Sequence, residues 1–184
     1  MTNSKKLSVR EICQISVFVT IIVFCAQLSI PLPGGIPLTF QTFGIALAGI
    51  VLGAKNATLA AVVYILLGAA GAPVFANFAG GLHHIFGPTG GFILSFPAIA
   101  FFAGVGGTKE NIISQVSWLT IGVALNSICG MLFFSLQTSL SLPAAFTAAV
   151  LPFIPMDIIR IIILSLAGRR IKQALIKSGL YKPQ

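Results

Sequence analysis

The chain has 184 residues, of which 57% are hydrophobic and only 8% are charged. Soluble domains carry about a quarter charged residues, so this composition excludes an ordinary water-soluble protein. In a soluble protein, the formal net charge of +8 would favour nucleic acid as a partner. Here the basic residues instead flank apolar segments, as they do in membrane proteins beside an anionic membrane surface. No nucleic-acid partner is therefore expected.

Apolar segments of nearly membrane-spanning length follow one another along the chain. A spanning helix needs about 20 apolar residues, somewhat fewer where loops dip into the interface, so the chain has room for about six. We predict spans at residues 12–30, 40–53, 57–72, 90–105, 112–134 and 155–175, and a short outer helix at 143–151. The expected fold is an all-α integral membrane protein, a single membrane domain of residues 1–184 forming a bundle of six transmembrane helices.

Basic residues mark alternate ends of these segments. Apart from Arg160 they are Lys5, Lys6, Arg10, Lys55, Lys109, Arg169, Arg170, Lys172, Lys177 and Lys182. The connections at 31–39, 73–89 and 135–143 contain none. Because cytoplasmic loops are enriched in Lys and Arg, both termini are predicted to be cytoplasmic and the three uncharged connections to face outward. The expected location is the plasma membrane, with the lipid bilayer as surroundings.

Two amides at or within the predicted spans have two open interpretations each. Gln41 follows the first outward connection and could contribute to an outer cavity or cap the second span. Asn126, in the fifth span, is equally consistent with helix packing and with ligand contact.

The long outward connection at 73–89 continues into Gly90 and Gly91. Non-helical backbone at membrane depth must be covered by protein or line a cavity, so this loop is expected to fold over a ligand. Its glycines permit a close approach of backbone, and Asn77 and Thr89 supply neutral hydrogen-bonding groups. The aromatic residues Phe75, Phe78 and Phe86 could form apolar walls or a lid; the alternative is a flexible outer loop.

His83 and His84 are adjacent in this loop and suggest a metal site. Metal sites usually combine several histidine, cysteine or acidic ligands, and no aspartate, glutamate or cysteine lies near these two histidines in the sequence. We therefore expect no bound metal.

Asp157 and Arg160 lie within the last apolar segment. At a spacing of three they share a helix face and can partly neutralise each other. An ionised side chain at mid-membrane costs about 2.5 to 3.5 kcal/mol on insertion scales, so such residues usually face a cavity or the bundle interior. The pair is therefore predicted to form a binding site; the alternative is a polar clamp between helices or a charge pair at the outer interface.

Four motifs in this order resemble a known family. They are LTFQTF at 38–43, PVFANF at 73–78, GPTGG at 87–91 and PFIPMDIIR at 152–160. Together they resemble the BioY family, the biotin-specific S components of energy-coupling factor (ECF) transporters, over essentially the whole chain. The resemblance implies six helices, cytoplasmic termini and a vitamin-binding subunit that captures biotin from outside without being an enzyme and without a cofactor.

The resemblance also implies roles for individual residues. Asp157 would accept hydrogen bonds from the ureido N–H groups of biotin. Arg160 would orient that carboxylate, donate to the ureido oxygen or meet the valerate carboxylate, and the family often has a lysine there. Gln41, Asn77 and Thr89 would be further polar contacts, and Gly90 and Gly91 would allow close approach.

The partners implied by the resemblance are a transmembrane coupling subunit and two cytoplasmic ATPases. The chain itself has no phosphate-binding loop of the G-x-x-x-x-G-K-[ST] type. S components resemble one another in a small-residue stripe on the first span, where the coupling subunit docks. Ser16 and Thr20 have this spacing here and are the expected interface residues.

Two other classes of function remain open from the sequence. In a stand-alone secondary transporter of a small organic solute, Asp157 would carry a proton, although the two halves show no internal repeat. In an intramembrane enzyme, Asp157 would act with His83 or His84, although no nucleophile motif is present.

Overall fold

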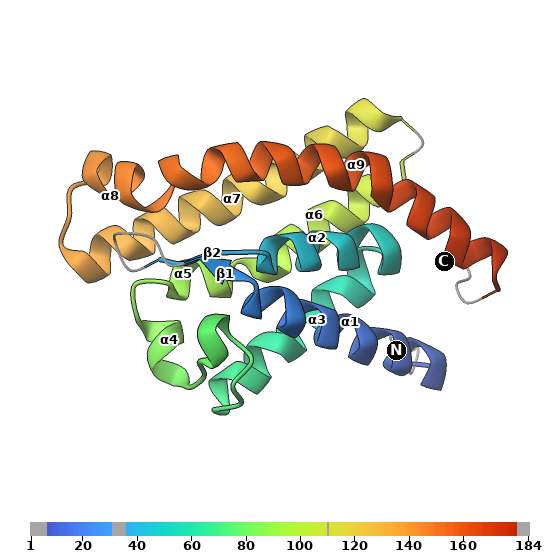
Figure 1. The fold of residues 1–184 in the computed structure, drawn as a ribbon, viewed down its shortest axis with the longest axis horizontal. Coiled ribbons are helices and arrows are strands. Elements are labelled where there is room, and N and C mark those ends of the chain that lie inside the picture. The colour runs from blue at the N-terminus through green and yellow to red at the C-terminus, as the bar shows by residue number, and fades with distance from the viewer. Residues whose placement is uncertain (1–6, 31–35, 110, 180–184) are drawn as a thin grey trace, which may run out of the picture.

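The structure, a computed structural model, describes residues 7–30, 36–109 and 111–179, without the side chains of residues 169, 175 and 176 (Figure 1). Lys5, Lys6, Lys182 and the side chain of Arg169 therefore lie outside the described part. Most of the described chain is helical. Figure 1 shows long helices lying side by side, with both ends of the chain at the same end of the molecule.

Helix α1 (Val9–Gln27) begins at a capping box. The Ser8 hydroxyl accepts a hydrogen bond from the Glu11 N–H at 3.2 Å, and the Glu11 carboxylate accepts one from the Ser8 N–H at 2.8 Å. The pair satisfies two N–H groups that have no partner within the helix. This local signal explains why α1 begins where the polar N-terminal segment ends.

A two-stranded hairpin, absent from the predicted all-α fold, follows α1. Strand β1 (Ser29–Ile30) pairs antiparallel with β2 (Leu38–Thr39), with Ser29 opposite Thr39. Pro37, directly before β2, has no N–H to donate and does not continue a helix. The chain therefore leaves α1 in an extended form and returns beside it.

Helices α2 (Gln41–Leu52) and α3 (Ala54–Ala69) are separated by a single residue, Gly53. Its φ of 79° lies in the left-handed region, which glycine adopts without a steric penalty. The chain can therefore reverse sharply here, and both helices remain short.

Short helical elements occupy the next segment, where a non-helical loop is predicted. They are η1 (Ala76–Phe78) and α4 (Leu82–Phe86). Two further helices follow, α5 (Gly90–Leu94) and α6 (Phe96–Gly107). The predicted span at 90–105 is thus divided at Ser95, whose hydroxyl donates to the Gly91 carbonyl at 2.7 Å. Pro97 contributes to this break because it has no N–H to donate.

The C-terminal part contains the two longest helices. Helix α7 (Ile112–Thr138) begins at Asn111, whose side chain accepts a hydrogen bond from the Ile113 N–H at 2.9 Å. Helix α8 (Leu142–Ala149) and η2 (Leu151–Phe153) lead into α9 (Ile154–Lys177). Asp157 lies in the first turn of α9.

Helices α2 and α6 form the centre of the bundle. Helix α2 contacts α1, α3, α6 and α9, and most of its residues are buried. Close approach to α6 depends on Gly49, where an added Cβ would lie 2.5 Å from the Cβ of Ala103. Gly49, the first glycine of a Gly49-x-x-x-Gly53 pattern, therefore serves close helix packing.

The outer surface of the bundle is apolar. Exposed large hydrophobic residues include Phe24 on α1, Leu125 and Ile128 on α7, and Ile158 and Ile162 on α9. Four described helical segments are long and apolar enough to cross a membrane: Val9–Gln27, Gly90–Gly107, Ile112–Thr138 and Leu142–Ala174. Helices α2 and α3 are apolar but shorter. Such a surface suits lipid, so the protein is membrane-embedded.

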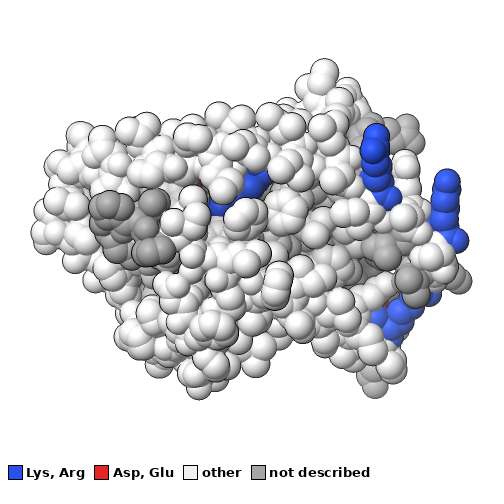
Figure 2. Space-filling view, viewed as in Figure 1, with Lys and Arg blue, Asp and Glu red and all other residues white. Residues whose placement is uncertain are grey.

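Segments carrying basic residues meet at one end of the molecule. Arg10 donates to the carbonyl of Gly179, which joins the start of α1 to the segment after α9. Lys172 donates to the Gly107 carbonyl at 2.9 Å, which places the end of α6 there too. Figure 2 shows basic side chains gathered at the end where the termini lie, with a further basic patch in a central depression.

Candidate functional site

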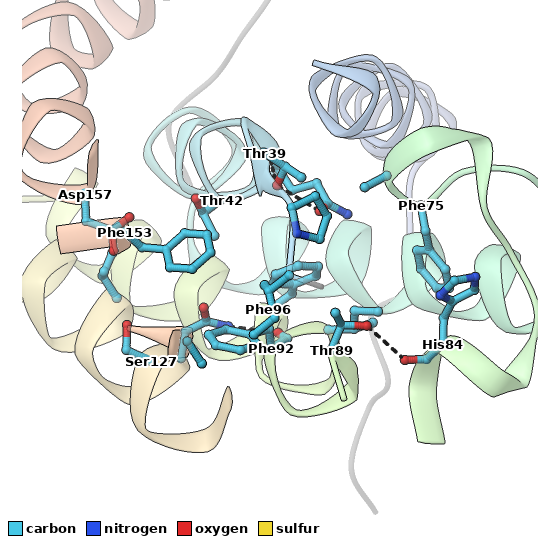
Figure 3. A pocket seen from close by; sticks show the side chains of 18 of the residues that line it. Thr39, Thr42, Phe75, His84, Thr89, Phe92, Phe96, Ser127, Phe153 and Asp157 are labelled. Atoms are coloured by element: carbon cyan, nitrogen blue, oxygen red, sulfur yellow. Dashed lines mark hydrogen bonds between the residues drawn. The ribbon is translucent and has the colours of Figure 1, made fainter. Parts of the chain in front are cut away.

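A cavity of about 290 Å³ is lined by elements that lie, in Figure 1, toward the end of the bundle away from the chain termini. Its lining residues come from five segments, at 36–42, 75–89, 92–96, 123–127 and 149–160. The segments are distant in sequence, and the helix bundle brings them together. In Figure 3, Asp157 and Phe153 lie at one end of the cavity, and Phe75 and His84 at the other.

The ion pair predicted from the sequence lies in the wall of this cavity. Nη1 of Arg160 donates to Oδ1 of Asp157 at 2.8 Å, across the expected spacing of three on one helix face. The side chains are 7% and 16% exposed, respectively. Both charges can be buried because each partner neutralises the other. An unpaired ion within a membrane would have no such compensation.

Arg160 also connects α9 to the segment entering α2. Its Nη1 donates to the Thr42 hydroxyl at 2.7 Å, and its Nη2 donates to the Thr39 carbonyl. The guanidinium carbon lies 5.9 Å from the ring centroid of Phe40. These contacts use the planar fork of the guanidinium and hold it in a single orientation. The carboxylate of Asp157 is positioned by the same arrangement.

A chain of hydrogen bonds connects the cavity-lining residue Thr39 to buried groups behind the cavity wall. The Thr39 hydroxyl donates to Oε1 of Gln41 at 2.9 Å, and Nε2 of Gln41 donates to the Tyr64 hydroxyl at 2.6 Å. Tyr64, which is fully buried, donates in turn to the Val74 carbonyl at 2.9 Å. Gln41 therefore lines the cavity and is fixed by α3. It does not cap α2, whose N-cap residue is Phe40 without a side-chain cap.

The loop after α3 supplies the opposite wall. Phe75 is buried and packs edge-to-face on Tyr64 at 5.6 Å and on His84 at 6.1 Å between ring centroids. Asn77 lies at the rim and accepts a hydrogen bond from Ser29 at 2.6 Å. Thr89 also lines the cavity, and its hydroxyl donates to the His84 carbonyl at 3.4 Å (Figure 3).

The apolar part of the cavity differs from the one predicted. Phe78 and Phe86 are 72% and 65% exposed and are not among the lining residues. Aromatic walls come instead from Phe92, Phe96 and Phe153, together with Phe75 (Figure 3). No local sequence signal marks these phenylalanines, because their shared surface exists only after α5, α6 and η2 have packed.

Asn126 is both a packing residue and a cavity residue. Its Nδ2 donates to the Phe92 carbonyl at 2.8 Å and to the Ser95 hydroxyl at 2.7 Å, so it ties α7 to the break between α5 and α6. The side chain also lines the cavity, beside Ser127. The two interpretations of this residue are therefore compatible.

Gly90 and Gly91 lie outside the cavity lining. A Cβ at Gly90 would lie 1.8 Å from the carbonyl oxygen of Ile85, and one at Gly91 would lie 2.4 Å from the Cβ of Phe133. Glycine is thus required here for close packing of α5 against α4 and α7. The structure does not bring these two residues together with the other predicted site residues.

Ser16 and Thr20 lie on the exposed face of α1 and form part of a shallow apolar groove between α1 and α3. Each hydroxyl donates to a carbonyl one turn earlier in the helix, those of Ile12 and Ser16, at 3.0 Å. Their hydrogen-bonding capacity is therefore largely satisfied within α1, and they present small side chains to the surroundings.

The histidines do not form part of a metal site in the described part of the chain, where no group of three or more potential ligands is found. The rings of His83 and His84 lie 4.1 Å apart, and His84 lines the cavity. Burial, together with the neighbouring His83, lowers the pKa of His84. A neutral His84 at pH 7 leaves Asp157 and Arg160 as the charged groups of the described cavity lining.

The arrangement suits a small ligand with polar and apolar parts. The carboxylate of Asp157 is an acceptor at one end, neutral amides and hydroxyls lie along the cavity, and aromatic rings enclose the remainder. Ligand sites commonly combine mainly apolar walls with a few placed polar groups. Binding of such a molecule is what this geometry can do chemically.

Known proteins resemble this chain over most of its length. A sequence model of the BioY family matches residues 1–177. The chain is 38% identical over 166 residues to the biotin transporter BioY of Thermotoga maritima, covering 89% of this chain and 96% of that protein. It is 38% identical over 154 residues to the probable biotin transporter BioY of Pyrococcus horikoshii, covering 84% and 91%, respectively.

A solved structure is also similar. It is a crystal structure at 2.1 Å of the S-component for biotin from an ECF-type ABC transporter, with a TM-score of 0.82, 26% sequence identity, and coverage of 94% of this chain and 95% of that one. The family match and the two relatives extend over most of the sequence. This chain therefore belongs to the BioY family.

Proposed function

We propose that this chain is the biotin-binding S component of an ECF-type importer. The observation that carries the proposal is the cavity, in which an acid–base pair faces aromatic walls in a member of the BioY family. The resemblance found in the sequence is confirmed by the family match. The similar curated proteins are named transporters, and the chain is a transport protein and not an enzyme.

In this proposal, Asp157 accepts hydrogen bonds from the ureido N–H groups of biotin. Arg160 orients the carboxylate, because its two terminal nitrogens already contact Asp157, Thr42 and Thr39. This assignment is favoured over direct contact of Arg160 with the valerate carboxylate. A carboxylate acceptor is effective here because hydrogen bonds with a charged partner are about twice as strong as neutral ones.

The remaining contacts follow from the cavity lining. Gln41, Asn77 and Thr89 offer neutral polar groups, and the aromatic side chains enclose the fused rings and the aliphatic chain of biotin. Biotin is bound as the transported substrate, and no cofactor is proposed. For Gly90 and Gly91 we propose a structural role, in the packing of α5 against α4 and α7.

The short helices α2 and α3 complete a bundle of six spans in one membrane domain. We place both termini in the cytoplasm, because the basic segments gather at the end of the molecule where the termini lie. The cavity then faces outward, where biotin is captured. The protein would reside in the plasma membrane.

Import requires partners, which we propose to be a transmembrane coupling subunit and two cytoplasmic ATPases. Small side chains allow close approach between helices in a membrane, and Ser16 and Thr20 present such side chains on the exposed face of α1. The groove to which they belong is also lined by Leu59 and Val63 of α3, which would extend the docking surface.

Calorimetric titration of the detergent-purified chain with biotin tests the function, and Arg160→Lys tests the site. Lysine keeps the charge but cannot reproduce the fork that joins three groups, so we expect about tenfold weaker binding from the loss of about 1.4 kcal/mol. Arg170→Lys, on the exposed surface of α9, is the matched control and should bind as the parent does. Absence of saturable binding by the parent would refute the function; equal binding by Arg160→Lys would refute the role of the fork.

Gly68→Ala should distort the cavity wall without changing any lining residue. A Cβ at Gly68 would lie 2.1 Å from Cζ of Phe75, so the ring must shift. We expect a loss of about 1–3 kcal/mol in stability, as for other overpacked cores, together with weaker biotin binding. Thermal unfolding with and without biotin measures both effects. The double variant Gly68→Ala, Phe75→Leu should recover stability, and failure to do so would argue against this contact as the cause.

A further inference from the structure

The loop that forms the rim of the cavity has an unusual backbone. Phe75 and Ala79 pair as an isolated antiparallel bridge, with the Phe75 N–H donating to the Ala79 carbonyl at 2.9 Å. Within this closed loop, Asn77 has a φ of 59° and Phe78 a φ of 56°. Two consecutive residues other than glycine in the left-handed region are uncommon, and a bulky aromatic residue is especially disfavoured there.

This conformation therefore needs support from outside the loop. Packing of Phe78 does not provide it, because that side chain is 72% exposed. Asparagine adopts the left-handed region more readily than most residues, whereas phenylalanine does not. Residues in such conformations persist when their surroundings hold them, and they concentrate at functional sites.

Gln27, the last residue of α1, makes the contacts that hold the loop. Its Nε2 donates to the Phe75 carbonyl at 3.1 Å and lies 3.5 Å from the Val74 carbonyl. Its Oε1 accepts from the Phe78 N–H at 2.8 Å. The carboxamide thus bonds both sides of the turn at once, and the two carbonyls on one side and the N–H on the other determine its orientation.

A second contact from the same part of the chain acts on the side chain of Asn77. The Ser29 hydroxyl donates to Oδ1 of Asn77 at 2.6 Å, two residues after Gln27 in the sequence. Asn77 is a cavity-lining residue, whereas neither Gln27 nor Ser29 is. Gln27 therefore contacts the backbone on which a cavity residue is presented, without lining the cavity itself.

We propose that Gln27 is a positioning residue for the ligand: through its carboxamide it holds the loop at 74–79 in the conformation that presents Asn77 and Phe75 to the cavity. This inference rests on the proposed function, since the ligand is taken to be biotin. It extends the binding machinery to the C-terminal end of α1.

The test is a comparison of biotin affinity and dissociation rate in the parent, Gln27→Met and Gln27→Glu, each as the full-length chain in detergent. Methionine keeps the length but removes the hydrogen bonds of the carboxamide, and we expect about tenfold weaker binding, mainly through faster dissociation. Glutamate keeps an acceptor for the Phe78 N–H but loses the donor to the Phe75 carbonyl, so it should also weaken binding. Gln137→Met, on an exposed position of α7, is the control and should change neither quantity.

A double-mutant cycle with Asn77→Ala separates positioning from a general loss of structure. If Gln27 acts by presenting Asn77, Gln27→Met should weaken binding by less than about threefold once the Asn77 side chain is gone. Equal losses in both backgrounds, or parent-like affinity of Gln27→Met, would overturn the proposal while leaving biotin binding by the parent intact. Absence of biotin binding by the parent would instead remove the proposed function and this role with it.

Hydrogen exchange without ligand gives an independent measurement. The Phe78 N–H is held by Gln27, so its exchange should accelerate in Gln27→Met and remain slow in Gln137→Met. Unchanged exchange in Gln27→Met would show that another group maintains the loop and would also overturn the proposal.

Discussion

Replacement of Asp157 by asparagine is expected to weaken biotin binding by about 10- to 150-fold, which corresponds to the loss of about 1.5–3 kcal/mol for hydrogen bonds to a charged group. Asparagine has nearly the same shape, so the cavity keeps its volume while the acceptor loses its charge. The substitution also leaves the guanidinium of Arg160 without its anion in a buried position. Breaking a buried ion pair costs about 3–5 kcal/mol, so a lower unfolding temperature is expected as well.

The two effects of Asp157→Asn must be separated. Titration at a temperature where the variant is fully folded reports affinity, and thermal unfolding without biotin reports stability. Glu11→Gln is the matched control, because it makes the same chemical change in the capping box of α1, where glutamine is also accepted. Parent-like affinity of Asp157→Asn would remove Asp157 from the ligand contacts.

Gly90→Ala is expected to destabilise the protein by about 3 kcal/mol or more, the upper end of the range for overpacking. The added Cβ would meet the Ile85 carbonyl oxygen at 1.8 Å, and backbone cannot rotate away as a side chain can. Because Gly90 is outside the cavity lining, the fraction of molecules able to bind should fall, while the dissociation constant of the folded fraction stays close to that of the parent.

Calorimetry distinguishes these outcomes, since the number of sites and the affinity are fitted separately. Gly122→Ala is a suitable control, because a Cβ there would be 3.2 Å from its nearest neighbour, the Cβ of Phe102, a tight contact that a small shift can relieve. A Gly90→Ala variant of parent-like stability with a changed dissociation constant would indicate that this glycine approaches the ligand.

The candidate site was only partly predictable from the sequence. Asp157 and Arg160 were identifiable because a charged side chain in a membrane-spanning segment costs free energy and is usually retained for a function. Their pairing follows from the helical spacing of three. Gln27 and Tyr64 gave no such signal, because an amide at a helix end and a tyrosine in an apolar segment are both ordinary. Their importance depends on hydrogen bonds to the loop at 74–79, across 47 or more residues for Gln27.

The glycine-rich motif is ambiguous in sequence. Gly90 and Gly91 suggested close approach to a ligand, but a glycine can equally permit close approach of another helix, and sequence does not distinguish the two. Here the neighbours are Ile85 and Phe133. Likewise, Phe78 and Phe86 share the loop with Phe75, yet only Phe75 lines the cavity.

Membrane embedding, the acid–base pair and family membership were determined by the sequence alone, because composition, helical spacing and ordered motifs are local or linear properties. The tertiary structure decided which polar and aromatic residues share one cavity and which glycines serve packing. It also decided how α1 supports the rim through Gln27. The physical reason is that hydrogen bonds and steric contacts between distant segments depend on the relative placement of packed helices, which no local pattern specifies.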